Sequence, residues 1–255
     1  MGIVATPNDF GAMGDKPTHP ELLDYLATEL VRQGWKLKAL HRLIVTSATY
    51  RQASSPGRNP TAEKAARVDP EDKLLWRARI KRREAEAIRD AVLQVSGQLN
   101  RRMYGPSNCP ELPAALADYG WDPDEKPVDR NRRSTYVLAK RNFSYPLFAA
   151  FDQPDRVNSC PIRATTITAP QALAMLNGEF TLVQARHLSG VLLAAHGRDA
   201  YKLIRAAYLR AFSRQPDGDE IATAQTFLER QARLIASKGD PGRDAQPEPK
   251  PRGMD

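Results

Sequence analysis

The sequence predicts a mainly α-helical, multi-helix domain with a Pro-rich irregular middle and at most a small β element. Three observations support this class. Apolar residues recur at helical spacing in the first and last thirds of the chain. Nine of the 20 prolines crowd into residues 105–170, where they interrupt regular structure. The chain is 41% hydrophobic and 27% charged, a balance typical of a folded globular protein.

The first predicted element is a pair of helices near the start of the chain. Thr18 and Glu21 stand at capping-box spacing, with Pro20 in the first turn, where its missing N–H is tolerated. Leucines follow at helical spacing as far as Gly34, a natural helix stop. A second helix is expected over 36–49, and it ends in a polar string at 46–52. The short connection favours antiparallel packing.

The middle of the chain is predicted to be less regular. Residues 54–70 are expected to form a surface loop, and 71–99 to be helical, in two pieces joined near 79–82. Within the Pro-rich part, Ser134–Ala139 is the best strand candidate, although the sequence identifies no partner strand. Residues 146–151 are expected to form a helical turn.

The last third is predicted to be helical again. Helices are expected over 170–176, 180–195 and 199–212, and another after the turn at 216–219. Beyond Ser237 the prolines and alternating charges predict disorder. We therefore expect one domain over 1–236, with a loop-rich insert at about 104–169, and a disordered tail at 237–255.

The motifs of several functional classes are missing from the sequence. It contains no Gly-rich phosphate loop, no Gly-x-Ser-x-Gly elbow and no zinc-hydrolase helix motif. No apolar run is long enough for a membrane span, and no signal peptide is visible. Cys109 and Cys160 are too far apart in sequence for a metal knuckle, and both a disulfide and two free thiols remain open.

The charge balance favours an anionic partner. The chain has 38 Lys and Arg against 30 Asp and Glu, so a polysaccharide or another anion is a candidate ligand. Nucleic acid is the least favoured, because the basic run at 77–83 has one neighbouring aromatic and adjoins glutamates that can pair with it. The candidate ligand-binding residues are Thr46, Thr49, Tyr50, Arg51, Arg133, Tyr136, Arg141 and Asn142. The structural alternative for the arginines is that they bridge loop carbonyls and carboxylates.

An enzyme is the alternative from a different functional class. His19, Asp24 and His41 would gather in one cleft if the first two helices pack antiparallel, as a hydrolase-like or metal-dependent site requires. The structural alternative is that His19 supports the helix start and His41 packs or faces solvent. No residue is assigned as a metal ligand.

Several phrases of the sequence resemble one family, in that family's order. These phrases are Thr6–Gly11, Thr18–Asp24, His41–Gln52, Glu84–Asp90, Thr165–Leu173 and Tyr208–Glu220. Together they make the chain similar to the C-terminal uncharacterised domain, a PSD-type domain of unknown function, of large planctomycete proteins that contain a cytochrome-c-like domain.

The resemblance supplies no established activity, but it implies what kind of parent protein the domain belongs to. In that family an uncharacterised domain lies upstream and often a haem domain near the N-terminus, so haem is expected only upstream and no cofactor in this chain. An exported or cell-envelope parent is implied, with the upstream domain as partner. Because the chain opens almost inside the first phrase, it is expected to be an N-terminally truncated copy or fragment. The leading hypothesis is a non-catalytic interaction domain that binds an anionic or polysaccharide ligand.

Overall fold

The computed structural model describes residues 3–9, 11–55, 60–113, 116 and 120–237. Over these residues the chain is mainly helical, with ten α-helices and no β-sheet, which confirms the predicted fold class. None of the helices in this described part is long and apolar enough to cross a membrane.

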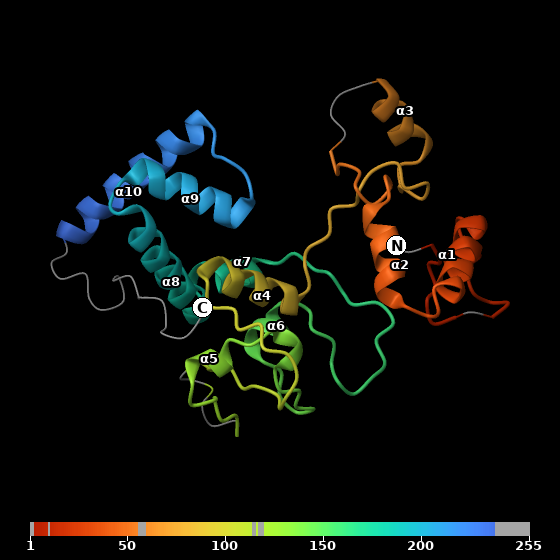
Figure 1. The fold of residues 1–255 in the computed structure, drawn as a ribbon, viewed down its shortest axis with the longest axis horizontal. Helices are drawn as coiled ribbons and strands as arrows, with labels where there is room; N and C mark the ends of the chain where they lie inside the picture. Colours follow the sequence, from red (N-terminus) through yellow and green to blue (C-terminus); the bar gives the residue numbers. More distant parts are fainter. Residues whose placement is uncertain (1–2, 10, 56–59, 114–115, 117–119, 238–255) are drawn as a thin grey trace. The chain divides into compact units, whose positions relative to one another are not determined.

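The chain folds into two compact units (Figure 1). Unit 1 comprises Met1–Arg82 and Cys160–Ile162, and unit 2 comprises Arg83–Ser159 and Arg163–Asp255. Unit 1 contains α1 (Pro20–Arg32), α2 (Leu37–Thr46) and α3 (Pro60–Val68). Unit 2 contains α4 (Ala85–Ser96), α5 (Pro127–Arg130), the 3₁₀ turn η2 (Ser134–Tyr136), α6 (Pro146–Ala150), α7 (Ala169–Asn177), α8 (Glu179–His196), α9 (Ala200–Phe212) and α10 (Gly218–Ser237). A single domain over 1–236 stays a prediction.

Helices α1 and α2 of unit 1 pack against each other, as the sequence predicts. The chain reverses at Gly34, whose φ of +66° suits glycine. The predicted capping box is wrong, because the helix begins one residue later than that spacing requires. His19 is the N-cap residue, and its side chain does not cap the helix. Instead the Thr18 hydroxyl lies 2.9 Å from His19 Nδ1 and donates to the Ile3 carbonyl.

The segment between α2 and α4 differs from the sequence prediction. The expected loop at 54–70 contains α3, and the expected helix at 71–82 is a loop instead. Two buried carboxylates organise this loop. Asp69 accepts hydrogen bonds from the backbone N–H groups of residues 73 and 74, at 2.9 and 2.7 Å, and Asp72 accepts from the Arg79 guanidinium at 3.3 Å. These side-chain bonds to loop groups replace a helical ladder.

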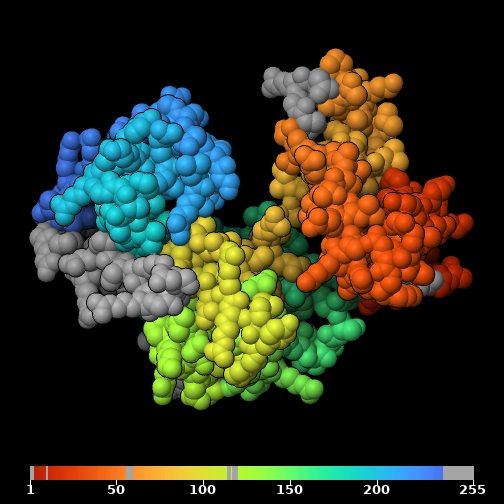
Figure 2. Space-filling model, viewed as in Figure 1, coloured from red at the N-terminus to blue at the C-terminus, as the bar shows by residue number. Residues whose placement is uncertain are grey.

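The buried core of unit 2 is built largely from the Pro-rich middle. Trp121, Tyr145, Phe148 and Phe151 cluster there with Ala85 of α4. The Trp121 ring lies against Tyr145, with their centroids 6.1 Å apart, and its Nε1 donates to the carbonyl of Pro110 at 2.7 Å. Figure 2 shows the yellow α4 region and the green middle segments packed together in one mass. The irregular middle therefore supplies most of the buried core cluster of unit 2.

The predicted strand at Ser134–Ala139 is wrong. Ser134–Tyr136 forms the turn η2, and Val137 makes an isolated parallel bridge with Asn108. Two backbone bonds hold this bridge, from Asn108 N–H to the Tyr136 carbonyl and from Leu138 N–H to the Asn108 carbonyl, at 2.8 and 2.9 Å. The segment has the side chains of a strand, but no segment in the described part of the chain continues the ladder.

The helices of the last third agree with the sequence prediction. Gly178 both ends α7 and begins α8, and a Cβ atom there would lie 2.2 Å from the Ala174 carbonyl oxygen. Helix α10 ends at Ser237, and the rest of the predicted disordered tail lies outside the described residues. Cys109, half-buried in unit 2, and Cys160, exposed in unit 1, are both free thiols.

Candidate functional site

The three residues of the enzyme alternative all lie in unit 1. His19 precedes α1, Asp24 lies within α1 and His41 lies within α2; His19 is half-buried, whereas the other two are exposed. Among the residues that the structure describes, no group of three His, Cys, Asp or Glu side chains is placed to hold a metal ion. The structure therefore adds no observation in favour of metal chemistry at these residues, and the cleft stays a prediction.

The polar string at the end of α2 forms the turn that terminates the helix. Thr46 donates to the Arg42 carbonyl at 2.8 Å. The Ser47 hydroxyl donates to the Ile44 carbonyl and accepts from the Tyr50 N–H, at 2.7 and 3.2 Å. Thr49, Tyr50 and Arg51 are exposed. Turn formation thus accounts for Thr46 and Ser47, whereas ligand binding by the exposed three stays a prediction.

The second group of candidate ligand-binding residues lies in unit 2. Arg133 is half exposed, with its Nε 3.7 Å from the Asp90 carboxylate, and the Tyr136 hydroxyl accepts from the Tyr104 N–H at 2.8 Å. Arg141 and Asn142 are exposed.

Two arginines next to these candidates bridge loop carbonyls, as the structural alternative predicts. Arg132 donates to the carbonyls of Pro106, at 2.6 Å, and of Tyr104. Arg130 donates to the carbonyls of Asp124 and Glu125. These two guanidinium groups therefore hold the loop together.

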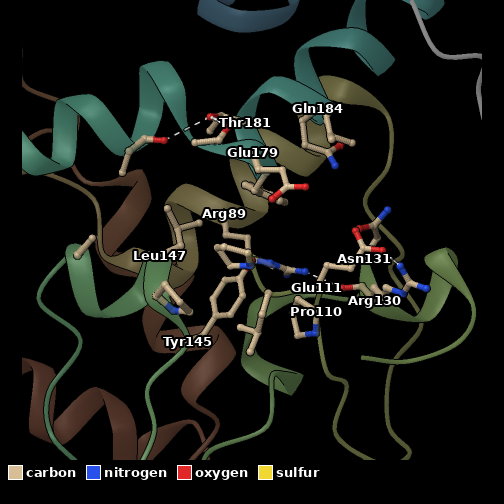
Figure 3. Close-up of a pocket in the computed structure, with 18 of the residues that line it drawn as sticks. Arg89, Pro110, Glu111, Arg130, Asn131, Tyr145, Leu147, Glu179, Thr181 and Gln184 are labelled. Carbon is tan, nitrogen blue, oxygen red and sulfur yellow. Dashed lines mark hydrogen bonds and ion pairs between the residues drawn. The ribbon is translucent and has the colours of Figure 1, made fainter. Parts of the chain in front are cut away.

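A pocket of about 400 Å³ lies in unit 2 (Figure 3), and none of these candidates is among its lining residues. This volume is within the range of about 300–1,000 Å³ that is usual for small-molecule sites. Half of the lining residues are apolar, and four of them are prolines. The lining residues are Arg89, Pro110, Glu111, Leu112, Pro113, Pro127, Arg130, Asn131, Tyr145, Pro146, Leu147, Ala150, Ala174, Gly178, Glu179, Phe180, Thr181, Val183, Gln184 and His187.

Helical spacing on α8 supplies one wall of the pocket. Phe180, Gln184 and His187 recur every three or four residues and therefore share one face. The N-cap residue Tyr145 and the first turn of α6 contribute aromatic and aliphatic surface. The 110–113 loop and α5 contribute a further wall, where prolines fix the backbone.

Arg89 of α4 is the most buried charged residue at the pocket, with 1% of its surface exposed. Its Nη1 donates to the Arg132 carbonyl at 3.0 Å and to the Ser134 hydroxyl at 3.2 Å, and its Nη2 donates to the Arg130 carbonyl at 2.6 Å. Its Nε is buried without a hydrogen-bond partner. No carboxylate in the described part of the chain forms an ion pair with this guanidinium.

Burial has opposite electrostatic effects on Arg89 and its neighbour Tyr145. It lowers the pKa of the guanidinium, although Tyr145 and Asp90 oppose that effect. It also raises the pKa of the Tyr145 hydroxyl, against the influence of Arg89. Because a guanidinium stays protonated at neutral pH, Arg89 places a positive charge in a part of unit 2 that is largely shielded from water.

The hydrogen-bonding groups of the pocket fall into two kinds. Gln184 is buried, and its Oε1 accepts from Ser96 at 2.8 Å, which leaves its Nε2 as a donor near the upper end of the pocket (Figure 3). Glu179 is exposed at the first position of α8, and Glu111 pairs with Arg130. The buried side of the pocket therefore carries the Arg89 cation and the Gln184 Nε2 donor, whereas its exposed side carries two carboxylates.

Sequence reasoning did not select these residues as a site. Arg130 and Tyr145 lie in the same stretch of sequence as the candidate ligand-binding residues of unit 2, but none of those candidates lines the pocket. One signal was available for Arg89: an arginine stands on the apolar stripe of α4, next to Ile88 and one turn before Leu93. A charged residue at a core position indicates a paired or functional group.

The fold and pocket define a helical protein with a cavity sized for a small ligand. Over residues 1–228 the chain matches the family model PSD1, described as a protein of unknown function (DUF1553). Since the match covers most of its length, the chain belongs to this family. No curated protein and no solved structure matches it.

Proposed function

We propose that this chain is a non-catalytic binding domain whose unit 2 pocket takes an organic anion. The observation that carries the proposal is Arg89, a fully buried guanidinium beside a cavity, with no carboxylate ion pair in the described part of the chain. Burial of a charge is costly unless the charge is paired. Carbonyl oxygens stabilise this one in part, and a bound anion would complete its neutralisation.

The Arg89 charge acts on a ligand mainly through space. Its guanidinium lies just beneath the pocket surface, where the low dielectric makes Coulomb attraction stronger than in water. The Gln184 Nε2 donor faces the same region and supplies a direct hydrogen bond. A carboxylate accepts from such a donor and also benefits from the buried cation.

The body of the ligand is apolar or has an apolar face. Pro110, Leu147 and Phe180 are among the lining residues, and they offer contact surface without hydrogen-bonding groups. An aliphatic carboxylate and the uronate of an acidic polysaccharide are two sources of the same anionic group. The pocket chemistry favours the first, and the experiment separates them.

Calorimetric titration with matched compounds tests the proposal. We expect 4-methylpentanoate to bind at least ~10-fold more tightly than its neutral amide, because a hydrogen bond to a charged group contributes about 1.5–3 kcal/mol. The variant Gln184→Glu keeps the acceptor for Ser96 but places a negative charge in the pocket, and it should abolish this preference.

Gln94→Glu is the matched control, because it makes the same charge change on an exposed part of α4, outside the pocket. Equal binding of acid and amide to the unmodified protein would refute the proposal. Tighter binding of trigalacturonate than of 4-methylpentanoate would assign the carboxylate to a polysaccharide.

A second proposal concerns unit 1 and the multidomain parent. We propose that α1 and α2 pack on an upstream domain of a cell-envelope protein. Neither helix contains a fully buried residue, and large apolar side chains are exposed on or between them, including Val31, Trp35 and Leu37 at 57–71%. Such surfaces often mark interfaces. Unchanged hydrogen exchange of α1 and α2 when the upstream domain is co-expressed would contradict this proposal.

A further inference from the structure

The pocket carries acidic groups as well as the cationic side on which the proposed function rests. Glu179 is exposed at the first position of α8 and lines the pocket, and the Glu111 carboxylate lines it while paired with Arg130. In Figure 3 the Glu179 carboxylate lies above the Arg89 side chain, and Glu111 lies near the guanidinium end of that side chain. A simple anion leaves these carboxylates without a role in binding.

The Arg89 guanidinium and the Glu179 carboxylate belong to walls of the pocket that contact each other through Phe180. The Phe180 ring is centred 5.7 Å from the Arg89 guanidinium carbon, and Glu179 directly precedes Phe180. Glu179 has no ion pair with any residue that the structure describes, whereas Glu111 is held by Arg130. A cationic group on a ligand would therefore meet Glu179 in preference to Glu111.

We propose that the pocket binds a zwitterionic ligand of dipeptide size with apolar side chains, its carboxylate toward Arg89 and Gln184 and its ammonium group at Glu179. This inference rests on the proposed function, because the carboxylate end is the anion of that proposal. Two extended residues span about 7 Å, a length that a 400 Å³ cavity accommodates. The apolar lining, including Leu147 and Val183, suits the side chains.

Three matched compounds separate the two ends of the ligand. Leucyl-leucine carries both charges, N-acetyl-leucyl-leucine lacks the ammonium group and leucyl-leucinamide lacks the carboxylate. In calorimetric titrations of the complete chain we expect leucyl-leucine to bind about 10-fold more tightly than either derivative, since each derivative loses one hydrogen-bonded charge.

One isosteric variant then locates the ammonium group. Glu179→Gln should bind leucyl-leucine no more tightly than the acetylated compound, while it retains the preference for leucyl-leucine over the amide. Glu125→Gln makes the same charge change at an exposed residue outside the pocket and should behave like the unmodified protein. Thermal melts of both variants confirm that the fold is intact.

The outcomes distinguish this inference from the proposed function. Equal binding of leucyl-leucine and its acetylated form, with the amide weaker, overturns the zwitterion and leaves anion binding in place. Equal binding of leucyl-leucine and its amide overturns the anion proposal itself. Retained preference for the free amino group in Glu179→Gln overturns the assignment of Glu179. An absence of binding heat with all three at millimolar concentration overturns both proposals.

Discussion

Substitution of Arg89 by methionine tests whether its buried guanidinium holds unit 2 together. Methionine fills a similar volume without charge, so the change removes the three hydrogen bonds from Nη1 and Nη2 and leaves the carbonyls of Arg130 and Arg132 without these donors. Each bond from a charged donor contributes about 1.5–3 kcal/mol. Relief from burying a charge offsets part of the loss, so we expect unfolding to become easier by about 3 kcal/mol.

Urea unfolding followed by tryptophan fluorescence measures this change. Trp121 reports on unit 2, because it is buried in that core, and Trp35→Phe and Trp76→Phe remove the signals of unit 1. The control Arg102→Met changes an exposed arginine and should alter the free energy of unfolding by less than about 0.5 kcal/mol. If Arg89→Met were as stable as this control, the guanidinium would not have the structural role inferred from its three bonds.

Three further predictions follow from local contacts. The pKa of Glu220 is lowered to about 2, first by hydrogen bonds from Arg214 and then by the Asp217 N–H. Because this folded-state pKa lies below the unfolded value of 4.5, the pair stabilises the protein above about pH 4.5 and loses that effect as the pH falls toward 2. Glu220→Gln should therefore reduce the difference between urea midpoints at pH 5 and pH 3, and an unchanged difference would contradict the pairing. Gly178→Ala should lower the melting temperature, because its Cβ would meet a backbone carbonyl, whereas Gly218→Ala, with no atom within 4 Å, should not. Equal melting temperatures would refute this packing argument. With a thiol reagent, the exposed Cys160 should react before Cys109, whose pKa is raised mainly by burial; single Cys→Ser variants identify the two rates, and the reverse order would be inconsistent with these environments.

Two of the sequence phrases that carry the family resemblance hold distant parts of unit 2 together. Glu84 and Glu86 both bind Arg163, at 3.1 and 2.8 Å. Three residues further along α4, Arg89 binds the carbonyls of the 130–134 segment, and Asp90 accepts from the Ser134 N–H at 2.7 Å. The phrase Glu84–Asp90 therefore attaches two remote loops to one helix.

A second phrase has a similar structural role. Thr166 donates from its N–H and its hydroxyl to the Asp152 carboxylate, at 2.8 and 2.9 Å. The buried Gln171 donates to the Thr166 hydroxyl at 3.0 Å and accepts from the Thr168 N–H at 3.2 Å. The phrase Thr165–Leu173 thus fixes the start of α7 to the turn after α6.

The sequence determined the helical class and most of the helices, because periodic apolar residues and Gly or Pro boundaries are local signals. It failed at 71–82, where the carboxylates of Asp69 and Asp72 capture loop groups, and at Ser134–Ala139, where β-branched residues meet no ladder. Both failures have the same cause. The hydrogen-bond partners of these two segments depend on the surrounding structure, and hydrophobic periodicity carries no information about those partners.

Tertiary structure alone decided where the core and the pocket lie. The Pro-rich middle supplies Trp121, Tyr145 and Phe148, which no regular spacing connects. Arg89 became a site candidate because α4 places it under loops from 130–134 and against α8. The pocket brings together residues from distant parts of the chain, and no pattern in a single sequence connects them: Arg89, Glu111, Tyr145, Glu179 and Gln184. Their convergence is a property of packing, which depends on contacts between residues far apart in the chain.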